Sequence, residues 1–256
     1  MEVHGPFRGN AKSYSAQQQR GAEVGIPLLV EFYNELPEPQ EDDPKAWESR
    51  LRHGLEKFKK RVEERYTEGT LHRLVHSGDP QVRRATVLAL GLTGTMKTSN
   101  ALVAGMLHDS DRGVRQLASD ALWALWLRAD TEDNNQELHR IMNLRDRRRK
   151  RSALDALIGR SPNFAEAYNQ RAMLHFQAEE WQKSVTDCER VLKLNPYHFG
   201  AAAGLGRCYM ELGKHRAALK AFRHALRTNP GLEDVEEAIR ALENALGEEG
   251  RRDDKK

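Results

Sequence analysis

The stretch that decides the fold is FGAAAGLGRCYMELGKHRAALKAFRHALRTNP, residues 199–230. It ends in Pro230, and two further prolines, Pro196 and Pro162, precede it at equal steps along the chain. Proline cannot continue a helix, and it disfavours helical dihedrals in the residue before it. The three prolines therefore mark the ends of helices in a 34-residue repeated unit.

Side-chain size follows the same period. The small residues are Ala172 and Gly206, then Ser184 and Ala218, and the larger ones include His175 and Tyr209, Cys188 and Phe222, Leu192 and Leu226. Two paired helices per unit explain this pattern, because small side chains let helices approach and bulky ones fill the remaining space.

This arrangement resembles the tetratricopeptide (TPR) family, which builds solenoids from helix–turn–helix units. Residues 199–230 carry the match best, and Ala165–Pro196 follows it, although Arg171 stands at a usually apolar position. A weaker unit precedes them, with Leu138, Ile141, Leu154, Leu157 and Pro162 in register. After Pro230, one apolar stripe predicts a capping helix: Val235, Ala238, Ile239, Leu242 and Leu246.

A second repeat, with a 32-residue period, lies upstream. The residues from His76 to Thr86 recur from His108 to Ala118, and each copy has a helix N-cap aspartate, Asp79 or Asp111. This pattern resembles HEAT-like repeats, in which the aspartate and a Val-Arg pair form a ladder between neighbours. The expected helices cover 68–77, 80–91, 98–108 and 112–128, and Trp123 and Trp126 are expected to pack on the first TPR helices.

The predicted fold class is therefore all-α, a helical solenoid (an α-α superhelix) of HEAT-like repeats followed by TPR repeats and a capping helix. The resemblance covers residues 67–246. In this region the chain is similar to bacterial TPR proteins of unassigned role. We expect a disordered or partly helical segment over 1–43, an amphipathic helix over 44–66, HEAT-like repeats over 67–130, TPR repeats with the capping helix over 131–246, and a charged tail over 247–256.

Composition limits the function classes. The sequence is 39% hydrophobic and 31% charged, and it has no apolar run long enough to span a membrane. The first twenty residues lack the apolar stretch of a secretory signal, and two cysteines are too few for a disulfide framework. A cytoplasmic location is the resulting expectation.

Three features suggest chemistry, but none is complete. Gly91–Thr98 departs from a phosphate-binding loop at Met96, where that motif needs glycine, and a helix rather than a strand precedes it. His72 and His76 share a helix face without a third metal ligand. Cys188 and Cys208 fit buried positions, with a disulfide or a reactive thiol as the alternative. We expect no catalytic residue, no metal and no cofactor.

The family resemblance implies binding of a protein or peptide in a concave groove lined by the first helix of each unit. Register places seven residues there: Asn169, Met173, Phe176, Gln177, Ala203, Arg207 and Met210. The other interpretation puts Met173, Phe176 and Met210 in the core between repeats. The leading hypothesis is a non-catalytic protein–protein interaction scaffold.

A basic run offers the alternative function, a nucleic-acid-associated adaptor. It consists of Arg145, Arg147, Arg148, Arg149, Lys150 and Arg151, interrupted by Asp146. Such a run is either solvated surface or a docking site for an acidic partner or nucleic acid. Because no aromatic residue is interleaved with it, nucleic acid is not the expected partner. Partner identity and oligomeric state stay open.

Overall fold

The computed structural model describes residues 27–38 and 43–253. These residues form α-helices and one short 3₁₀ helix, and no strand occurs among them, so the prediction of an all-α fold is confirmed. The chain divides into two compact units, unit 1 (Met1–Leu125) and unit 2 (Trp126–Lys256). The disorder expected within the first 43 residues falls mostly on positions outside the described ranges.

Unit 1 begins with two helices that both pack on α4: α1 (Leu28–Asn34) and α2 (Pro44–Arg65). The Asp43 side chain accepts a hydrogen bond from Ala46 N and caps α2, and Pro44 suits the first helical position. The predicted helix over 44–66 corresponds to α2, which buries Leu51, Phe58 and Val62.

The HEAT-like region contains α3 (Glu68–Leu74), α4 (Pro80–Thr93), α5 (Met96–Gly105), the 3₁₀ helix η1 (Met106–His108) and α6 (Arg112–Leu127). The helix expected over 68–77 ends three residues early. There, His76 N and Ser77 N bond to carbonyls three residues back, and such bonds tighten a last helical turn. Asp79 and Asp111 cap α4 and α6 as predicted, accepting from Gln81 N and Val114 N.

Two arginines of α4 build the ladder between the repeats. Arg83 donates Nε and Nη2 to Asp109 at 2.7 and 2.9 Å, and Arg84 pairs with Asp111 at 2.8 and 2.6 Å. Planar guanidinium groups suit such two-point contacts with a carboxylate. Arg83 and Arg115 also bond equivalent carbonyls, those of residues 77–78 and 109–110.

The stretch Gly91–Thr98 comprises the end of α4, a turn at Gly94 and Thr95, and the start of α5, so it is not a phosphate loop. Glu68 of α3 accepts hydrogen bonds from Thr95, Thr98 and Ser99. Burial raises the pKa of Glu68, but the bonds from Ser99, Thr98 and Thr95 outweigh it and lower the pKa below its usual value. A Cβ on Gly94 would lie 2.6 Å from the Leu90 carbonyl, so the turn also requires glycine.

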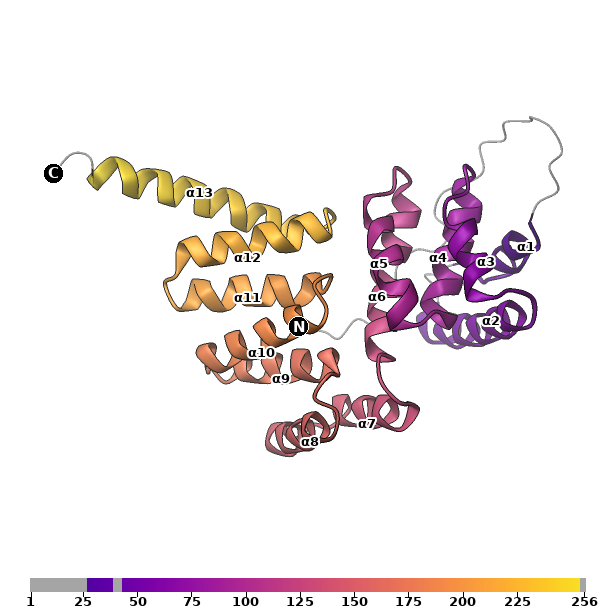
Figure 1. Cartoon of the computed structure of the whole chain (residues 1–256), viewed down its shortest axis with the longest axis horizontal. Helices are drawn as coiled ribbons and strands as arrows, with labels where there is room; N and C mark the ends of the chain where they lie inside the picture. The colour runs from indigo at the N-terminus through magenta and orange to yellow at the C-terminus, as the bar shows by residue number, and fades with distance from the viewer. Residues whose placement is uncertain (1–26, 39–42, 254–256) are drawn as a thin grey trace. The chain divides into compact units, whose positions relative to one another are not determined.

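Unit 2 continues as a series of helix pairs, α7 (Glu132–Met142) with α8 (Arg147–Arg160), α9 (Ala165–Gln177) with α10 (Trp181–Leu194), and α11 (Phe199–Glu211) with α12 (His215–Thr228). Helices α9 to α12 lie side by side in Figure 1, each packed on the next. The weak first unit packs as predicted, because Leu138, Ile141, Leu154 and Leu157 share one buried cluster.

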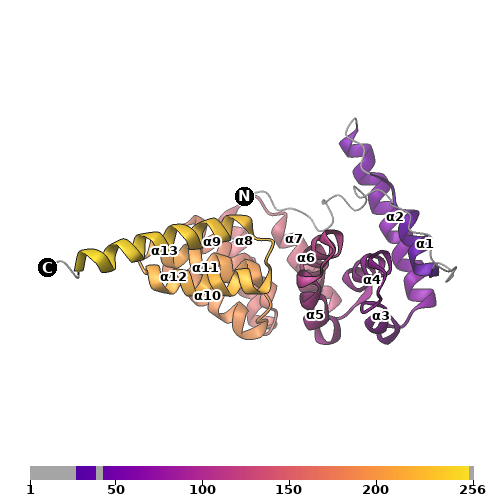
Figure 2. The ribbon, with the colours of Figure 1, turned by 90° about the horizontal axis from the view of Figure 1, so that it is seen from above.

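The capping helix is α13 (Glu233–Asp253), which packs on α12 and extends beyond it (Figures 1 and 2). Its Val235, Ile239 and Leu242 are buried with Phe222 in one core cluster. The small residue at Gly206 has a direct reason, since a Cβ there would lie 2.5 Å from the Phe222 ring.

Trp126 joins a buried polar pair in unit 2. Its ring stacks on that of His198, with centroids 4.1 Å apart, and contacts Phe199 at 5.2 Å. His198 Nδ1 accepts from Ala201 N, so the ring proton is on Nε2 and faces Glu166 at 3.0 Å. The contact expected with the first TPR helices is thus made instead with the start of α11.

Candidate binding groove in unit 2

A cavity of about 270 Å³ opens between α9, α11, α12 and α13. Its lining comprises Phe176, Arg207, Met210, Glu211, Phe222, Asp234, Val235 and Ala238. The register of the 34-residue repeat places α9 and α11 as first helices, and the start of α13 takes the next equivalent place. We call this lined space the groove.

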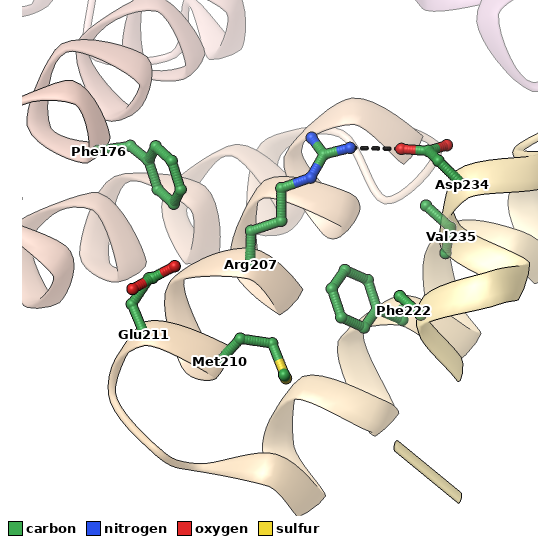
Figure 3. Close-up of a pocket in the computed structure, with 8 residues that line it drawn as sticks. Phe176, Arg207, Met210, Glu211, Phe222, Asp234 and Val235 are labelled. Atoms are coloured by element: carbon green, nitrogen blue, oxygen red, sulfur yellow. Dashed lines mark hydrogen bonds and ion pairs between the residues drawn. The ribbon is translucent and has the colours of Figure 1, made fainter. Parts of the chain in front are cut away.

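Figure 3 shows how the apolar and charged side chains are arranged. The rings of Phe176 and Phe222 lie on either side of the Arg207 and Met210 side chains, and Val235 lies beyond Phe222 on α13. Met210 is 38% exposed and lines the cavity. The groove therefore has an apolar floor that is open to solvent.

The rim carries one cation and two carboxylates. Arg207 donates from Nη2 to Asp234 Oδ2 at 2.6 Å, and both side chains are substantially exposed. No hydrogen bond or ion pair to Glu211 occurs within the described residues. The rim thus has a net negative charge with one carboxylate still available.

Three of the seven predicted groove residues line the cavity: Phe176, Arg207 and Met210. Gln177 is exposed and Met173 is partly buried, but neither is part of the lining. Asn169 and Ala203 were predicted to lie on the groove surface, but both are buried, and each is only 5% exposed. Asn169 is held inside by its bond to Glu166, and Ala203 packs in the core with Phe222.

The sequence left open whether Phe176 lines the groove or packs in the core between repeats, and its side chain does both. It packs against the core cluster of Cys188 and Cys208, and it meets Trp181 edge-on at 4.8 Å. Its partly exposed ring nevertheless borders the cavity. A substitution at Phe176 will therefore affect stability as well as any binding in the groove.

Sequence reasoning missed five lining residues, Glu211, Phe222, Asp234, Val235 and Ala238. The apolar ones had been assigned to the core or to the capping stripe. The available signal was the repeat itself, because Val235 and Ala238 lie one repeat period after Ala201 and Gly204 of the first helix α11. The first turns of the capping helix could have been read as a further groove wall.

An ion-pair network holds α9 against α8 and α10. Arg171 binds Asp187 through two hydrogen bonds of 2.8 and 2.7 Å, and it binds Asp155 at 2.8 Å. Hydrogen bonds to Asp187 raise the pKa of Arg171 further above its usual value. This network explains an arginine at a usually apolar repeat position, because two carboxylates from neighbouring helices neutralise it.

The basic run lies where α8 begins. Asp146 caps α8 by accepting from Arg149 N, and Lys150 donates to the Met142 carbonyl at 2.8 Å. Arg151 pairs with Glu180 at 2.8 Å. The other four basic residues, Arg145, Arg147, Arg148 and Arg149, are exposed.

The remaining candidate features form ordinary packing contacts. Cys188 and Cys208 are buried free thiols, and Cys208 Sγ donates to Ser184 Oγ. His72 Nε2 lies 3.1 Å from Ser99 Oγ, whereas His76 is exposed. Within the described ranges, no group of three or more His, Cys, Asp or Glu side chains could hold a metal ion. No helix in the described part of the chain has the length and apolar character needed to cross a membrane.

Family comparisons agree with this architecture. Residues 53–123 match the model of HEAT repeats, and residues 175–233 match a model of the tetratricopeptide repeat. The chain therefore contains a region that matches HEAT repeats, followed by a region that matches the tetratricopeptide repeat.

Among curated proteins, the chain is similar to a TPR repeat-containing protein of Rhizobium etli, with 34% identity over 93 residues, 36% of this chain and 46% of that protein. It is also similar to anaphase-promoting complex subunit 3 of Schizosaccharomyces pombe, with 33% identity over 69 residues, 27% of this chain and 10% of that protein. The chain thus spans less than half the length of either relative.

Solved structures with a similar helix arrangement include the crystal structure of MamA, with a TM-score of 0.43 and 21% identity over 54% of this chain and 86% of that one. Another is the first TPR of Spaghetti bound to an HSP90 peptide, with a TM-score of 0.39 and 18% identity over 45% of this chain and 89% of that one.

Proposed function

We propose that this chain is a non-catalytic adaptor that captures a segment of another protein in the groove of unit 2. The observation that supports it most is the cavity in which the exposed Met210 and the partly exposed Phe176 lie over the buried Phe222, beside a charged rim. Solenoid repeats generate extended concave surfaces of this kind, and repeat families of these two types are typically non-catalytic scaffolds.

The size of the cavity favours a side chain over a cofactor. Pockets for small molecules commonly measure roughly 300–1,000 Å³ and are more enclosed. The groove, at about 270 Å³, suits one large apolar side chain of a bound segment. Methionine at its edge can adapt to different shapes, since its side chain is unbranched and polarisable.

The rim supports a segment that also carries charge. Exposed ion pairs such as Arg207–Asp234 contribute roughly 0–1 kcal/mol, so a partner can replace that contact at low cost. The available Glu211 carboxylate then favours a lysine or arginine near the apolar anchor. The proposed ligand is thus a peptide segment with a bulky apolar residue and a nearby basic residue.

The test uses a peptide that is selected from a display library for binding to the full chain. The affinity of three groove variants for this peptide is then compared with that of the wild type. Glu211→Ala and Phe176→Ala should each weaken binding by at least about 1 kcal/mol, because one removes the carboxylate proposed to hold the basic residue and the other removes apolar contact. Met210→Asp should weaken it at least as much, because it places a charge in the apolar floor. Isothermal titration calorimetry measures the affinities, and melting curves measure stability.

Gln177→Ala is the matched control, because Gln177 follows Phe176 on α9 and is not part of the lining. It should bind like the wild type. Met210→Asp should melt close to the wild type, since Met210 is exposed, whereas Phe176→Ala should lose some stability. Wild-type affinity in both Glu211→Ala and Met210→Asp would remove the groove as the binding site.

A further inference from the structure

We infer that the four exposed arginines at the start of α8, Arg145, Arg147, Arg148 and Arg149, form a second binding surface, for the phosphate backbone of a nucleic-acid duplex. We call these four residues the basic surface. It is separate from the groove, and none of its members is part of the groove lining. This inference does not depend on the function proposed for the groove.

The charge of this surface is not neutralised within the protein. Lys150 and Arg151 of the same run have protein partners, the Met142 carbonyl and Glu180. In the described part of the chain, no carboxylate lies within ion-pair distance of the four arginines. The structure therefore divides the run into two cations that fasten α8 and four that face solvent.

The one carboxylate inside the run is already engaged. Asp146 accepts from Arg149 N at 2.8 Å. That hydrogen bond and the nearby charges of Arg149 and Arg148 lower the pKa of Asp146, which stays ionised at neutral pH. Because Asp146 caps the helix, the surface offers guanidinium groups to a ligand, not free backbone amides.

The position of the cations is unfavourable for the free protein. The N-terminus of a helix carries a partial positive charge, so basic residues in the first turn are repelled. Arg147, Arg148 and Arg149 occupy the first three positions of α8. An anionic ligand relieves this repulsion. The surface therefore prefers polyanions, and lysines and arginines spread evenly over a protein do not have this preference.

The residue types favour phosphate in a duplex over other polyanions. Arginine binds phosphate oxygens through two parallel hydrogen bonds. Residues 143–152 contain no aromatic side chain, and stacking on aromatic rings is how proteins usually hold single strands. A membrane-surface helix needs an apolar face, and the exposed residues of this surface are all charged. Because these contacts are confined to the phosphate backbone of the duplex, we expect binding without preference for nucleotide sequence.

The experiment uses the full chain and a fluorescein-labelled DNA duplex of about 20 base pairs and mixed sequence. Fluorescence anisotropy is measured between about 50 and 200 mM NaCl. We expect a dissociation constant of about 1–100 µM near physiological salt, the usual range for sequence-independent binding. Changing Arg147, Arg148 and Arg149 to Gln should weaken binding at least about tenfold. The same change should reduce the steepness of the plot of log association constant against log salt concentration by about 2–3, since each phosphate contact contributes about 0.9 to the slope.

Two variants control for charge and for position. Arg147→Lys, Arg148→Lys and Arg149→Lys together keep the charge but lose the two-point hydrogen bonds, so this variant should bind more weakly than the wild type and more tightly than the Gln variant. Arg216→Gln, Lys220→Gln and Arg227→Gln on α12 remove the same charge elsewhere and should change binding far less. The variant with Gln at positions 147, 148 and 149 should melt at no lower temperature than the wild type, since it reduces charge repulsion at the start of α8.

Absence of duplex binding at about 50 mM NaCl overturns the inference. An equal loss in the α12 variant also overturns it, because general attraction would then explain the binding. Polyglutamate, and vesicles of phosphatidylcholine with phosphatidylserine, are tested in parallel. If either binds as tightly as the duplex and loses binding in the same variant, the nucleic-acid assignment is wrong.

Discussion

Replacing Trp126 with alanine is expected to lower the free energy of unfolding by about 3–5 kcal/mol, the usual cost of removing a fully buried large aromatic side chain. Trp126 is 1% exposed and stacks on His198, itself fully buried beside Glu166. The substitution therefore leaves a void next to two polar groups whose hydrogen-bond geometry depends on dry surroundings. Urea unfolding followed by circular dichroism measures the change.

Tyr197→Ala provides the control for that measurement. Tyr197 is a large aromatic residue next to His198, but it is 38% exposed. Its removal should change stability by no more than about 0.5 kcal/mol, as is usual for surface positions. A loss below about 1 kcal/mol for Trp126→Ala would show that the stacking does not hold unit 2 together.

The second large effect is expected at Arg171. Changing Arg171 to Leu leaves Asp187, whose side chain is 5% exposed, without its guanidinium partner. Breaking a buried ion pair from one side costs about 3–5 kcal/mol, and the lower end applies here because Arg171 keeps some exposure. The loss should appear as a lower urea midpoint at neutral pH.

A double substitution separates charge from packing at this site. Arg171→Leu with Asp187→Leu removes both charges and should recover most of the lost stability, because apolar residues of similar size can replace a buried pair. Asp155→Asn alone should cost little, since Asp155 is largely exposed. If the double variant is no more stable than Arg171→Leu, packing rather than the stranded carboxylate explains the loss.

The helix pairs could be predicted because their signals are local or periodic. Evenly spaced prolines mark helix ends, and the 32-residue copy places Asp79 and Asp111 at helix starts, where both act as N-caps. Gly206 was recognisable as a contact position because the spacing aligned it with Ala172. Such features depend on neighbours a few residues away or on one repeat period.

Other features depend on contacts that periodicity does not encode. Arg171 finds Asp155 and Asp187 on two different helices, and neither pairing follows from the repeat pattern. Asn169 was expected on the groove surface, but its bond to Glu166 holds it inside. The groove itself needs the first turns of α13, whose apolar residues look the same in sequence whether they cap a core or line a cavity.

The groove of unit 2 is proposed to hold the apolar side chain of a bound segment. Met210 and Tyr197 allow a matched test, because both are 38% exposed and only Met210 lines the groove. The photoreactive residue benzoylphenylalanine is placed at position 210 in one variant and at position 197 in another. Each variant is irradiated with the display-selected peptide, and mass spectrometry locates the crosslink. If the groove holds that side chain, position 210 crosslinks to the peptide's apolar residue and position 197 gives little crosslinking. Equal crosslinking from both positions, or crosslinking from 197 alone, would show that the groove is not the binding site.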